Sequence, residues 1–489
     1  MELHKTNAYS HWKKIGIKPH HGVCIPLFSL HSQESCGIGE FPDLLPIIDW
    51  LKTVSMDIIQ LLPINDTGDQ ISPYSPISAT ALNPLYLGIS RLPSVKESPL
   101  IRSLKKLTGA PFIDYEKVRE GKEKFLRHYF HEMFPTLEKS KPYKEFVQNH
   151  PWLKDYADFM RIKKPQDNRD FYYFVQFLCY RQLKEVKKRA DRKGVMLKGD
   201  IPILISTDSS DVALHPELFD TRLSFGAPPD QYATNGQNWG FPLYRWEDEK
   251  EKILKWWKDR LQYQESFFHM YRIDHVVGLF RAWAIPKGNL ATEGEYIPKD
   301  RRKWIPQGRS ILQSFLDYTS MFPIAEDLGT VPDSVRKCLH EMGIPGTKVM
   351  RWEKRGTNSY ILPKNYPRDS MTCLSTHDTE TLQQWWNHTP SDAKNLAKSF
   401  GLTYQKRLSM HLREEILKLS HQSSSYFHIN LLQEYFPLVP GMSWDKPDSE
   451  RINRPDLNSK KNWRCRYRPS VDEITSNSEL KKKIREIID

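Results

Sequence analysis

Acidic residues stand at the ends of four short apolar runs of the chain. Asp200, Asp274 and Asp378 each end such a run, and Glu326 follows Phe-Pro-Ile-Ala in the same way. Such a set suits glycoside chemistry, in which one carboxylic acid protonates the leaving oxygen while a second carboxylate attacks the anomeric carbon. No His or Cys cluster at the spacing of metal ligands accompanies the acids. The pattern therefore predicts sugar chemistry without a metal or another cofactor.

Different protonation states are predicted for Asp274 and Glu326. Arg272 and Asp274 are two residues apart on a strand, so their side chains point to the same face. The fixed positive charge lowers the pKa of the neighbouring aspartate, which predicts Asp274 to be an ionised nucleophile. Glu326, beside that negative charge and partly desolvated, is predicted to have a raised pKa and to act as the acid. His377 and Asp378 are predicted to hold sugar hydroxyls in the transition state.

Each of these residues also has a structural interpretation. An aspartate at a strand end often caps the following helix, and His377-Asp378 fits such a cap. Arg272 and Asp274 fit a buried ion pair without a chemical role, and Glu326 could pair with a lysine. Asp327 is interpreted as structural. The occurrence of several such residues in the order of one series of strands favours the catalytic interpretation.

The elements that must position these side chains are short strands and longer helices. Eight apolar runs bounded by turn residues are predicted to be buried parallel strands, and the periodic segments between them to be helices. This alternation predicts an α/β protein with a (β/α)8 TIM barrel, whose catalytic side chains stand at the C-terminal ends of the strands. The predicted strands are 23–29, 57–63, 195–202, 271–276, 322–327, 347–351, 372–377 and 427–433.

The domain organisation follows from the gaps between these strands. The gap between the second and third strands is too long for a plain crossover, so residues 86–168 are predicted to form a mainly helical insertion subdomain. Residues 1–85 are then the first part of the catalytic barrel, and residues 169–489 are the remainder. Further loop insertions are predicted at about 208–246 and 284–309.

The composition is that of an ordinary globular protein. Hydrophobic residues make up 39% and charged residues 27% of the 489 residues. The net charge of +12 comes from separate basic clusters without a nucleic-acid motif, so we expect no nucleic-acid partner. No run has the length of a membrane span or of a signal-peptide core, and the six scattered cysteines fit free thiols. We therefore expect a cytoplasmic protein without a membrane partner, of undetermined oligomeric state.

A series of motifs resembles those of amylomaltases and disproportionating enzymes, the 4-α-glucanotransferases of glycoside hydrolase family 77 in the α-amylase clan. Three motifs carry the acids: Arg-Ile-Asp-His (272–275), Ala-Glu-Asp-Leu-Gly (325–329) and Thr-His-Asp (376–378). The others are Gly-Ile-Gly-Glu (37–40), Ser-Pro-Tyr-Ser (72–75), Asn-Pro-Leu-Tyr (83–86), Gly-Asp-Ile-Pro (199–202), Ser-Asp-Val (210–212), Gly-Ala-Pro-Pro-Asp (226–230), Gly-Gln-Asn-Trp-Gly (236–240), Arg-Ile-Asn-Arg-Pro (451–455) and Asn-Trp (462–463). The loop 226–240 is more specific to the family than the acid motifs, which the wider clan shares.

The resemblance implies a role for each matching residue. It implies Asp274 as nucleophile, Glu326 as general acid/base and Asp378 as transition-state stabiliser. Tyr74 would stack on the donor side and Trp239 would cover the acceptor side. The residues implied to bind substrate are Tyr74, Asp200, Trp239, Arg272 and His377.

The sequence also departs from the family pattern at a few positions. Ala213 stands where the family usually has Trp, Thr379 where Asn is common, and Asp456-Leu457 where Gly-Thr is usual. These departures affect the predicted shape of the subsites and not the three acids.

The implied function is transfer of a segment of an α-1,4-glucan to the 4-hydroxyl of glucose or a maltodextrin by a retaining double displacement. Maltooligosaccharides, longer glucans and glucose would be the substrates. One alternative is an α-amylase-clan hydrolase that uses water as acceptor, against which the loop 226–240 argues. Another is a non-catalytic glucan- or nucleic-acid-binding protein, against which the three acids argue. A retaining mechanism predicts the carboxyls of Asp274 and Glu326 to lie about 5–5.5 Å apart.

Overall fold

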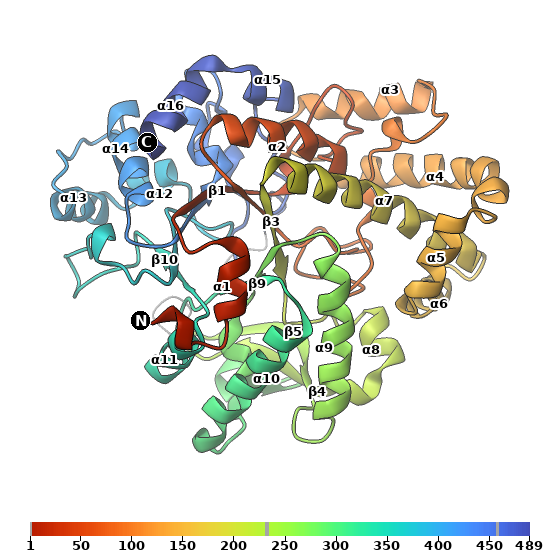
Figure 1. The fold of residues 1–489 in the computed structure, drawn as a ribbon, viewed down its shortest axis with the longest axis horizontal. Coiled ribbons are helices and arrows are strands. Elements are labelled where there is room, and N and C mark those ends of the chain that lie inside the picture. The colour runs from red at the N-terminus through yellow and green to blue at the C-terminus, as the bar shows by residue number, and fades with distance from the viewer. Residues whose placement is uncertain (1, 230–233, 456–458) are drawn as a thin grey trace.

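Eight parallel strands form the centre of the molecule (Figure 1). The computed structural model describes residues 2–229, 234–455 and 459–489. The strands pair in the order β10-β11-β12-β1-β2-β3-β6-β9, which is their order along the chain, started at β10. Their bounds are β1 His20–Ile25, β2 Ile58–Leu61, β3 Met196–Ile201, β6 Met270–Ile273, β9 Phe322–Ala325, β10 Gly346–Val349, β11 Ser370–Cys373 and β12 Phe427–Leu431. Each overlaps one predicted strand, so the predicted (β/α)8 barrel is confirmed.

The barrel is nearly closed between β9 and β10. The Ala325 N–H donates to the Pro345 carbonyl at 2.8 Å, and Thr347 Oγ1 donates to the Ala325 carbonyl at 3.0 Å. Asp327 accepts the Thr347 N–H at 2.7 Å, and a Cβ at Gly346 would lie 2.7 Å from the Asp327 carboxylate oxygens. Asp327 is thus a buried structural residue, as predicted, and it requires glycine at position 346.

Helices surround the barrel because the strands are buried on both faces and need apolar partners outside (Figure 1). The longest, α7, begins at the Asn168 cap and ends at Gly194, which adopts the left-handed conformation. The helices outside residues 86–168 and 208–246 are α1 Tyr9–Ile15, α2 Leu44–Thr53, α7 Arg169–Lys193, α9 Lys250–Glu265, α10 Trp304–Tyr318, α11 Asp333–Met342, α12 Leu382–His388, α13 Pro390–Ser399, α14 Met410–His421, α15 Val471–Ser476 and α16 Ser478–Ile488.

The segment predicted as a helical insertion carries four α-helices on one side of the barrel (Figure 1). They are α3 Pro99–Lys105, α4 Tyr115–Leu137, α5 Lys141–Asn149 and α6 Trp152–Lys163. Lys122 of α4 is buried and donates to Glu40 Oε1 at 2.5 Å and to the Leu85 and Leu87 carbonyls. This buried charge, fully hydrogen-bonded, fixes α4 to the first part of the barrel. The division at residues 85 and 168 stays a prediction.

The two segments predicted as loop insertions contain strands that the sequence analysis did not assign. After α8 Ser210–Leu214, strands β4 Phe219–Ala227 and β5 Gln237–Tyr244 form a hairpin. Strands β7 Ala282–Pro286 and β8 Glu295–Ile297 extend it to an antiparallel sheet of order β5-β4-β7-β8. Leu223 pairs with Pro286 and Gly226 with Trp283, so this sheet depends on pairing between distant segments that local periodicity cannot reveal.

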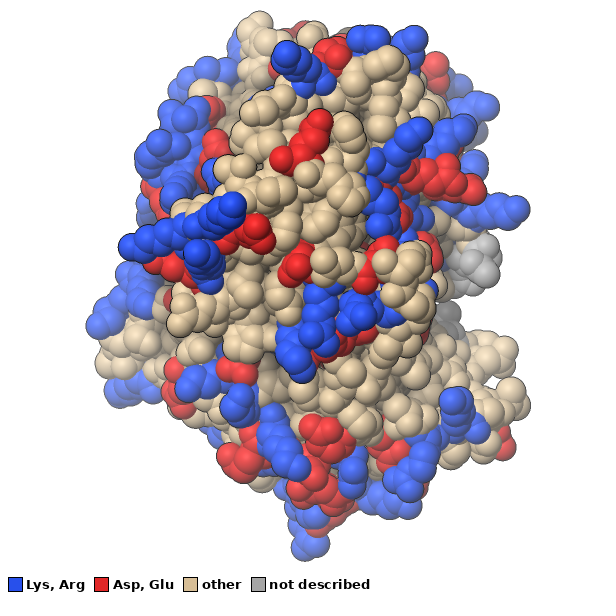
Figure 2. Space-filling model, turned by 90° about the vertical axis from the view of Figure 1, so that its right-hand side faces the viewer, with Lys and Arg blue, Asp and Glu red and all other residues tan. Residues whose placement is uncertain are grey.

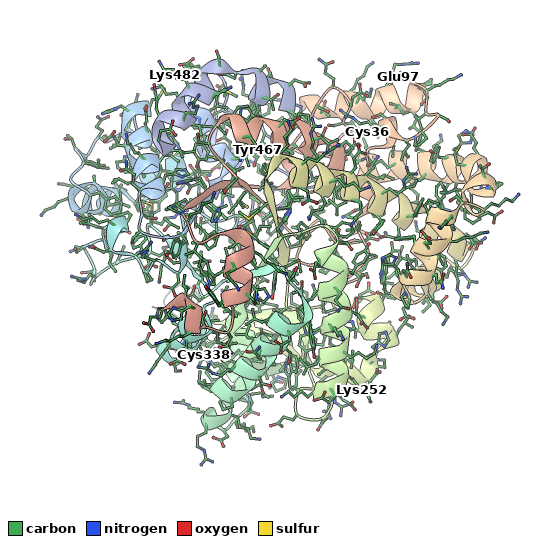
Figure 3. The ribbon with its side chains drawn as sticks, in the orientation of Figure 1. Cys36, Glu97, Lys252, Cys338, Tyr467 and Lys482 are labelled. Atoms are coloured by element: carbon green, nitrogen blue, oxygen red, sulfur yellow. The ribbon has the colours of Figure 1, made fainter. Side chains whose placement is uncertain are left out.

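Acidic and basic side chains are mixed on the surface, and the cysteines are free thiols. Lys and Arg side chains are interspersed with Asp and Glu over the face in Figure 2. All six cysteines are buried and unpaired, and Cys36 and Cys338 lie in different parts of the molecule (Figure 3). Among the described residues no helix has the length and apolarity needed to cross a membrane.

Buried histidines cluster at the N-terminal end of the barrel. His21 Nδ1 lies 2.8 Å from His421 Nδ1, and the His21 and His428 rings stack at 4.7 Å. His428 Nδ1 lies 2.9 Å from the Ser420 carbonyl, and His421 Nε2 lies 2.6 Å from the Tyr435 hydroxyl. Burial lowers the pKa of all three histidines, that of His428 to about 4. The cluster is therefore built for neutral imidazoles.

We predict that acid destabilises the fold through this cluster. A histidine with a lowered pKa stays neutral when folded, whereas the unfolded chain takes up its proton, so stability is lost as pH falls from about 6.5 to about 4. For His428 alone this amounts to about 3 kcal/mol. His428→Asn keeps a donor toward the Ser420 carbonyl and should reduce the difference in unfolding free energy between pH 7 and pH 4.5. His128→Asn, at an exposed histidine, is the control, and equal pH dependence in both variants would contradict the prediction.

Candidate active site

One guanidinium holds three carboxylates at the C-terminal end of the barrel. Arg272 Nη1 lies 2.7 and 2.8 Å from the two oxygens of Asp200 and 2.7 Å from Asp274 Oδ1. Arg272 Nη2 lies 3.1 Å from Glu326 Oε2. The arginine side chain is only 8% exposed. Three of the predicted acids therefore meet at one buried cation, as their positions at strand ends predicted.

The strand register explains why these side chains meet. In the parallel pairing of β3, β6 and β9, Asp200 is opposite Arg272, which is opposite Ile324. Asp274 and Glu326 each follow the last residue of their strand, and the Glu326 N–H donates to the Ile273 carbonyl at 3.0 Å. The two acids thus project from adjacent strand ends of the barrel, where such barrels place catalytic groups.

The protonation of the two acids differs from the prediction. Burial raises the pKa of Asp274 well above its usual range, and the charge of Glu326 adds to this against the lowering effect of Arg272. Burial also acts to raise the pKa of Glu326, but Arg272 and His275, whose N–H donates to Glu326 Oε2 at 2.6 Å, leave it lowered. The predicted directions, a lowered pKa for Asp274 and a raised pKa for Glu326, are therefore wrong for the ligand-free protein.

The opposite pKa shifts of Asp274 and Glu326 have a geometric cause. Arg272 serves three carboxylates, so its charge does not favour Asp274 alone. The backbone N–H of His275 is directed at Glu326 only, and a hydrogen bond to the charged form of an acid lowers its pKa. In the ligand-free protein Asp274 therefore holds a proton more readily than Glu326 does.

Asp378 faces the cluster from the end of β11. Its Oδ1 accepts a hydrogen bond from Asn453 Nδ2 at 2.7 Å, and its Oδ2 lies 3.2 Å from His377 Nε2. Burial acts to raise the pKa of Asp378, but His377, Asn453 and Arg272 outweigh it and hold the pKa at about 2. With this pKa the carboxylate is ionised at neutral pH. The side chain is 43% exposed, so a ligand can reach it.

Tyr74 lies on the side of the site where His377 stands. Its ring stacks on His377 at 5.0 Å and 17°, and Trp463 contacts both rings. The Tyr74 hydroxyl donates to Asp200 Oδ2 at 2.7 Å. Asp200 has no exposed side-chain surface, and it bonds Tyr74 and Arg272. The structure thus places Asp200 beneath the site as an anchor for these two residues.

Trp239 lies on β5 at the opposite side of the cluster. Its ring stacks on Phe225 at 5.8 Å and 8°, and meets the edge of His275 at 4.9 Å and 87°. Its Nε1 donates to Gln237 Oε1 at 2.8 Å. Trp239 is therefore connected through one ring to the residue that bonds Glu326. Asp230, in the same predicted loop, lies outside the described residues.

Thr379 has a defined role at the position where the sequence departs from the family pattern. Its Oγ1 accepts from the Thr376 N–H at 2.9 Å and from Arg351 Nη2 at 2.5 Å. The hydroxyl thereby closes the turn that carries His377 and Asp378. Ala213 lies in α8, and Asp456-Leu457 lies outside the described residues.

Three residues of the site had no role in the sequence analysis: His275, Asn453 and Trp463. Each stands in a quoted motif, but its contact depends on backbone geometry. His275 and Trp463 have positive φ angles of 45° and 63°. This conformation is uncommon for residues other than glycine, so neither residue type predicts it. Asn453 is brought to Asp378 by the chain's return from β12.

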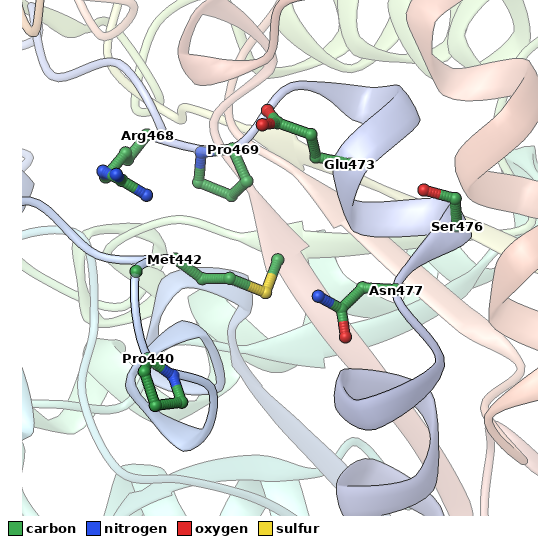
Figure 4. A pocket seen from close by; sticks show the side chains of 8 residues that line it. Pro440, Met442, Arg468, Pro469, Glu473, Ser476 and Asn477 are labelled. Carbon is green, nitrogen blue, oxygen red and sulfur yellow. The ribbon is translucent and has the colours of Figure 1, made fainter.

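Other candidate sites carry less chemistry. Among the described residues no group of three or more His, Cys, Asp or Glu side chains is arranged to hold a metal ion. A cavity of about 210 Å³ lies between the turn at 440–442 and α15 (Figure 4). Its polar lining includes Glu473 and Asn477, which already cap the helices α15 and α16. The carboxylate cluster is the site with reactive groups.

Comparison with known proteins gives consistent matches over the whole chain. A family model described as 4-alpha-glucanotransferase, glycoside hydrolase family 77, matches residues 25–171 and 163–472. The chain is 42% identical to the 4-alpha-glucanotransferase of Chlamydia muridarum, over 96% of this chain and 95% of the relative. It is 41% identical to that of Chlamydia pneumoniae, over 99% of this chain and 98% of the relative.

Solved structures show the same fold. The amylomaltase from Streptococcus agalactiae in complex with acarbose matches with a TM-score of 0.81 and 24% identity, over 96% of this chain and 98% of that chain. The amylomaltase from Corynebacterium glutamicum matches with a TM-score of 0.84 and 20% identity, over 99% of this chain and 76% of that chain.

We predict that Arg272→Met destabilises the protein in a pH-dependent way. Removing the cation leaves its carboxylates unpaired, which costs about 3–5 kcal/mol at pH 7. The pKa of Asp274 then rises further in the folded state and that of Glu326 loses the lowering effect of Arg272, so the deficit grows as pH rises from 5 to 7. Urea unfolding at both pH values measures it. Arg302→Met, at a side chain that is 90% exposed, is the control, and a deficit independent of pH would contradict the prediction.

Proposed function

The chain belongs to glycoside hydrolase family 77, the 4-alpha-glucanotransferases, and from this premise we propose how its own residues transfer a glucan segment from one sugar to another. The donor is an α-1,4-glucan or a maltooligosaccharide. The acceptor is the 4-hydroxyl of glucose or of a maltodextrin. The observation that carries the residue assignment is the group of acids held by Arg272 at the ends of β3, β6 and β9.

In the first half-reaction Asp274 attacks C1 of the glucose at the cleavage point, and Glu326 protonates the glycosidic oxygen. The reducing-end piece leaves and a covalent β-glucosyl-enzyme forms. Both carboxyls lie on one guanidinium, that of Asp274 at Nη1 and that of Glu326 at Nη2. This proximity supports a retaining mechanism, because an inverting pair must leave room for a water between its carboxyls.

The reaction needs an ionised Asp274 and a protonated Glu326, whereas in the ligand-free protein the pKa of Asp274 is raised and that of Glu326 is lowered. Positive charge that develops on the sugar ring in the transition state favours the ionised form of Asp274. The balance between the two acids must therefore shift toward a protonated Glu326 along the reaction.

In the second half-reaction Glu326 accepts the proton of the incoming 4-hydroxyl, which attacks C1 and restores the α-1,4 bond. Asp378, ionised and half exposed, binds sugar hydroxyls in both transition states with His377 beside it. Tyr74 stacks on the donor sugar. Arg272 and Asp200 position the acids and Tyr74 from below.

Preference for sugar over water is assigned to Trp239. Its ring stands beside His275 at the edge of the cluster and is half buried, so it offers an apolar face to an acceptor sugar. A bound acceptor displaces water and holds the 4-hydroxyl in the attack position.

Incubation with maltotriose tests the function and the roles. We predict a ladder of longer maltodextrins together with free glucose, resolved by chromatography. Asp274→Ala and Glu326→Gln should each lower transfer by about 10³-fold or more, because the reaction loses its nucleophile or its acid. Asp333→Asn, at an exposed carboxylate, is the control. Accumulation of glucose and maltose alone would indicate a hydrolase, and a fully active Asp274→Ala enzyme would refute its role.

A second prediction concerns the choice of acceptor. Trp239→Ala should lower the ratio of transfer to hydrolysis about 10-fold, because water gains access to the glucosyl-enzyme. Reducing-end release and chain lengthening, measured in the same reaction, give the ratio. Trp283→Ala removes a tryptophan from β7 of the same sheet, where the ring packs on Tyr296, and should leave the ratio unchanged. An unchanged ratio in Trp239→Ala would remove Trp239 from this role.

A further inference from the structure

We propose that His275 is a positioning residue that links the acceptor side of the site to the general acid. Its left-handed backbone directs an amide N–H at Glu326, and its ring transmits a displacement of Trp239 to that hydrogen bond. This inference rests on the proposed role of Glu326. The family resemblance implies roles for Asp274 and Glu326 but none for His275.

The backbone of His275 is the first observation. Its φ of 45° and ψ of 52° lie in the left-handed region, which is strained for a residue with a Cβ, and such strain gathers at functional sites. In this conformation the His275 N–H donates to Glu326 Oε2 at 2.6 Å, and the Val276 N–H approaches the Glu326 carbonyl at 3.3 Å. The turn after β6 therefore hydrogen-bonds both the side chain and the backbone carbonyl of Glu326.

The ring of His275 is the second observation. Trp239 meets it at 87° with centroids 4.9 Å apart, and Phe225 meets it at 85° and 5.6 Å. Phe225 and Trp239 are themselves parallel, so the imidazole is held against two aromatic rings of the antiparallel sheet. Such edge contacts have a preferred geometry. A shift of β4 and β5 must therefore move the imidazole or lose both contacts.

Space exists for such a shift. A cavity of about 160 Å³ is lined in part by Gly278 and by Phe225, whose ring contacts His275. Gly278 itself lies close to the imidazole, because a Cβ there would stand 3.1 Å from His275 Cδ2. Close-packed interiors resist displacement, whereas a ring that borders a cavity has room to move.

The electrostatics give the link a direction. Arg272, Asp274, His275 and Asp378 are the charged or titratable groups that act on Glu326. The His275 imidazole is kept neutral by burial, with Arg272 and Arg281 also lowering its pKa against Glu326. The N–H bond therefore acts as a fixed dipole that favours ionised Glu326. Loosening the His275 turn weakens that bond and favours the protonated acid.

An acceptor that presses on Trp239 thus acts on Glu326 through His275. A firm Trp239–His275 contact keeps the amide on Glu326 and favours its ionised form, which is the form that accepts the proton of the acceptor hydroxyl. An occupied acceptor site therefore favours the ionised form of Glu326, which acts as the base in the second half-reaction.

The pH profile of kcat/KM on maltotriose tests the link. Because Glu326 is the more acidic of the two coupled carboxyls, the acidic limb reports its pKa in the free enzyme. His275→Gly and His275→Asn tolerate the left-handed backbone but remove the ring, so the acidic limb should move to higher pH, by about one unit for the glycine variant. His275→Phe keeps an aromatic ring and should leave the limb within about 0.3 units of the parent.

Two further variants keep the test decisive. Phe225→Leu loosens the imidazole from the sheet side and should move the limb in the same direction by a smaller amount, even if the His275 variants fold poorly. Ser94→Gly removes an exposed left-handed serine far from the acids, and should leave the limb in place. An unmoved limb in His275→Gly and Phe225→Leu overturns the link. If Glu326→Gln is also fully active, the proposed role of Glu326 fails instead.

Discussion

The site depends on the ion pairs of Arg272. The three acids would repel one another or take up protons without this cation. The guanidinium offers several donors in one rigid plane, so it sets the positions of Asp200, Asp274 and Glu326 at once. A lysine, with a compact charge on a flexible stem, could not impose the same geometry.

The barrel places this cation and the attached sheet uses it. Parallel pairing of β3, β6 and β9 puts the charged side chains at the same level, and near closure of the barrel by Asp327 keeps β9 in register with β10. The antiparallel sheet then brings Trp239 to the edge of the cluster through His275. The barrel therefore supplies the acids, and the inserted strands supply Trp239, to which we assign the choice of acceptor; insertions of this kind let one fold host different chemistries.

The eight strands could be predicted because each is a short apolar run, buried on both faces, and the acids because they follow those runs directly. The strands of the antiparallel sheet could not, since Gly226 pairs with Trp283 across a long stretch of chain. The protonation of Asp274 and Glu326 was predicted wrongly for a related reason. Sequence shows that Arg272 is near Asp274, but not that it serves three acids or that the His275 amide points at Glu326.

Backbone strain marks both sides of the site. Of the four non-glycine residues with positive φ among those described, His275 contacts Trp239 and bonds Glu326, and Trp463 contacts Tyr74 and His377. Each such residue costs about 1–3 kcal/mol, which the surrounding packing must offset. At His275 the strained turn gives Glu326 a donor that a relaxed turn would aim elsewhere. In a pair of neighbouring acids, a donor directed at only one of them lowers the pKa of that acid relative to the other, and here it favours the ionised form of Glu326.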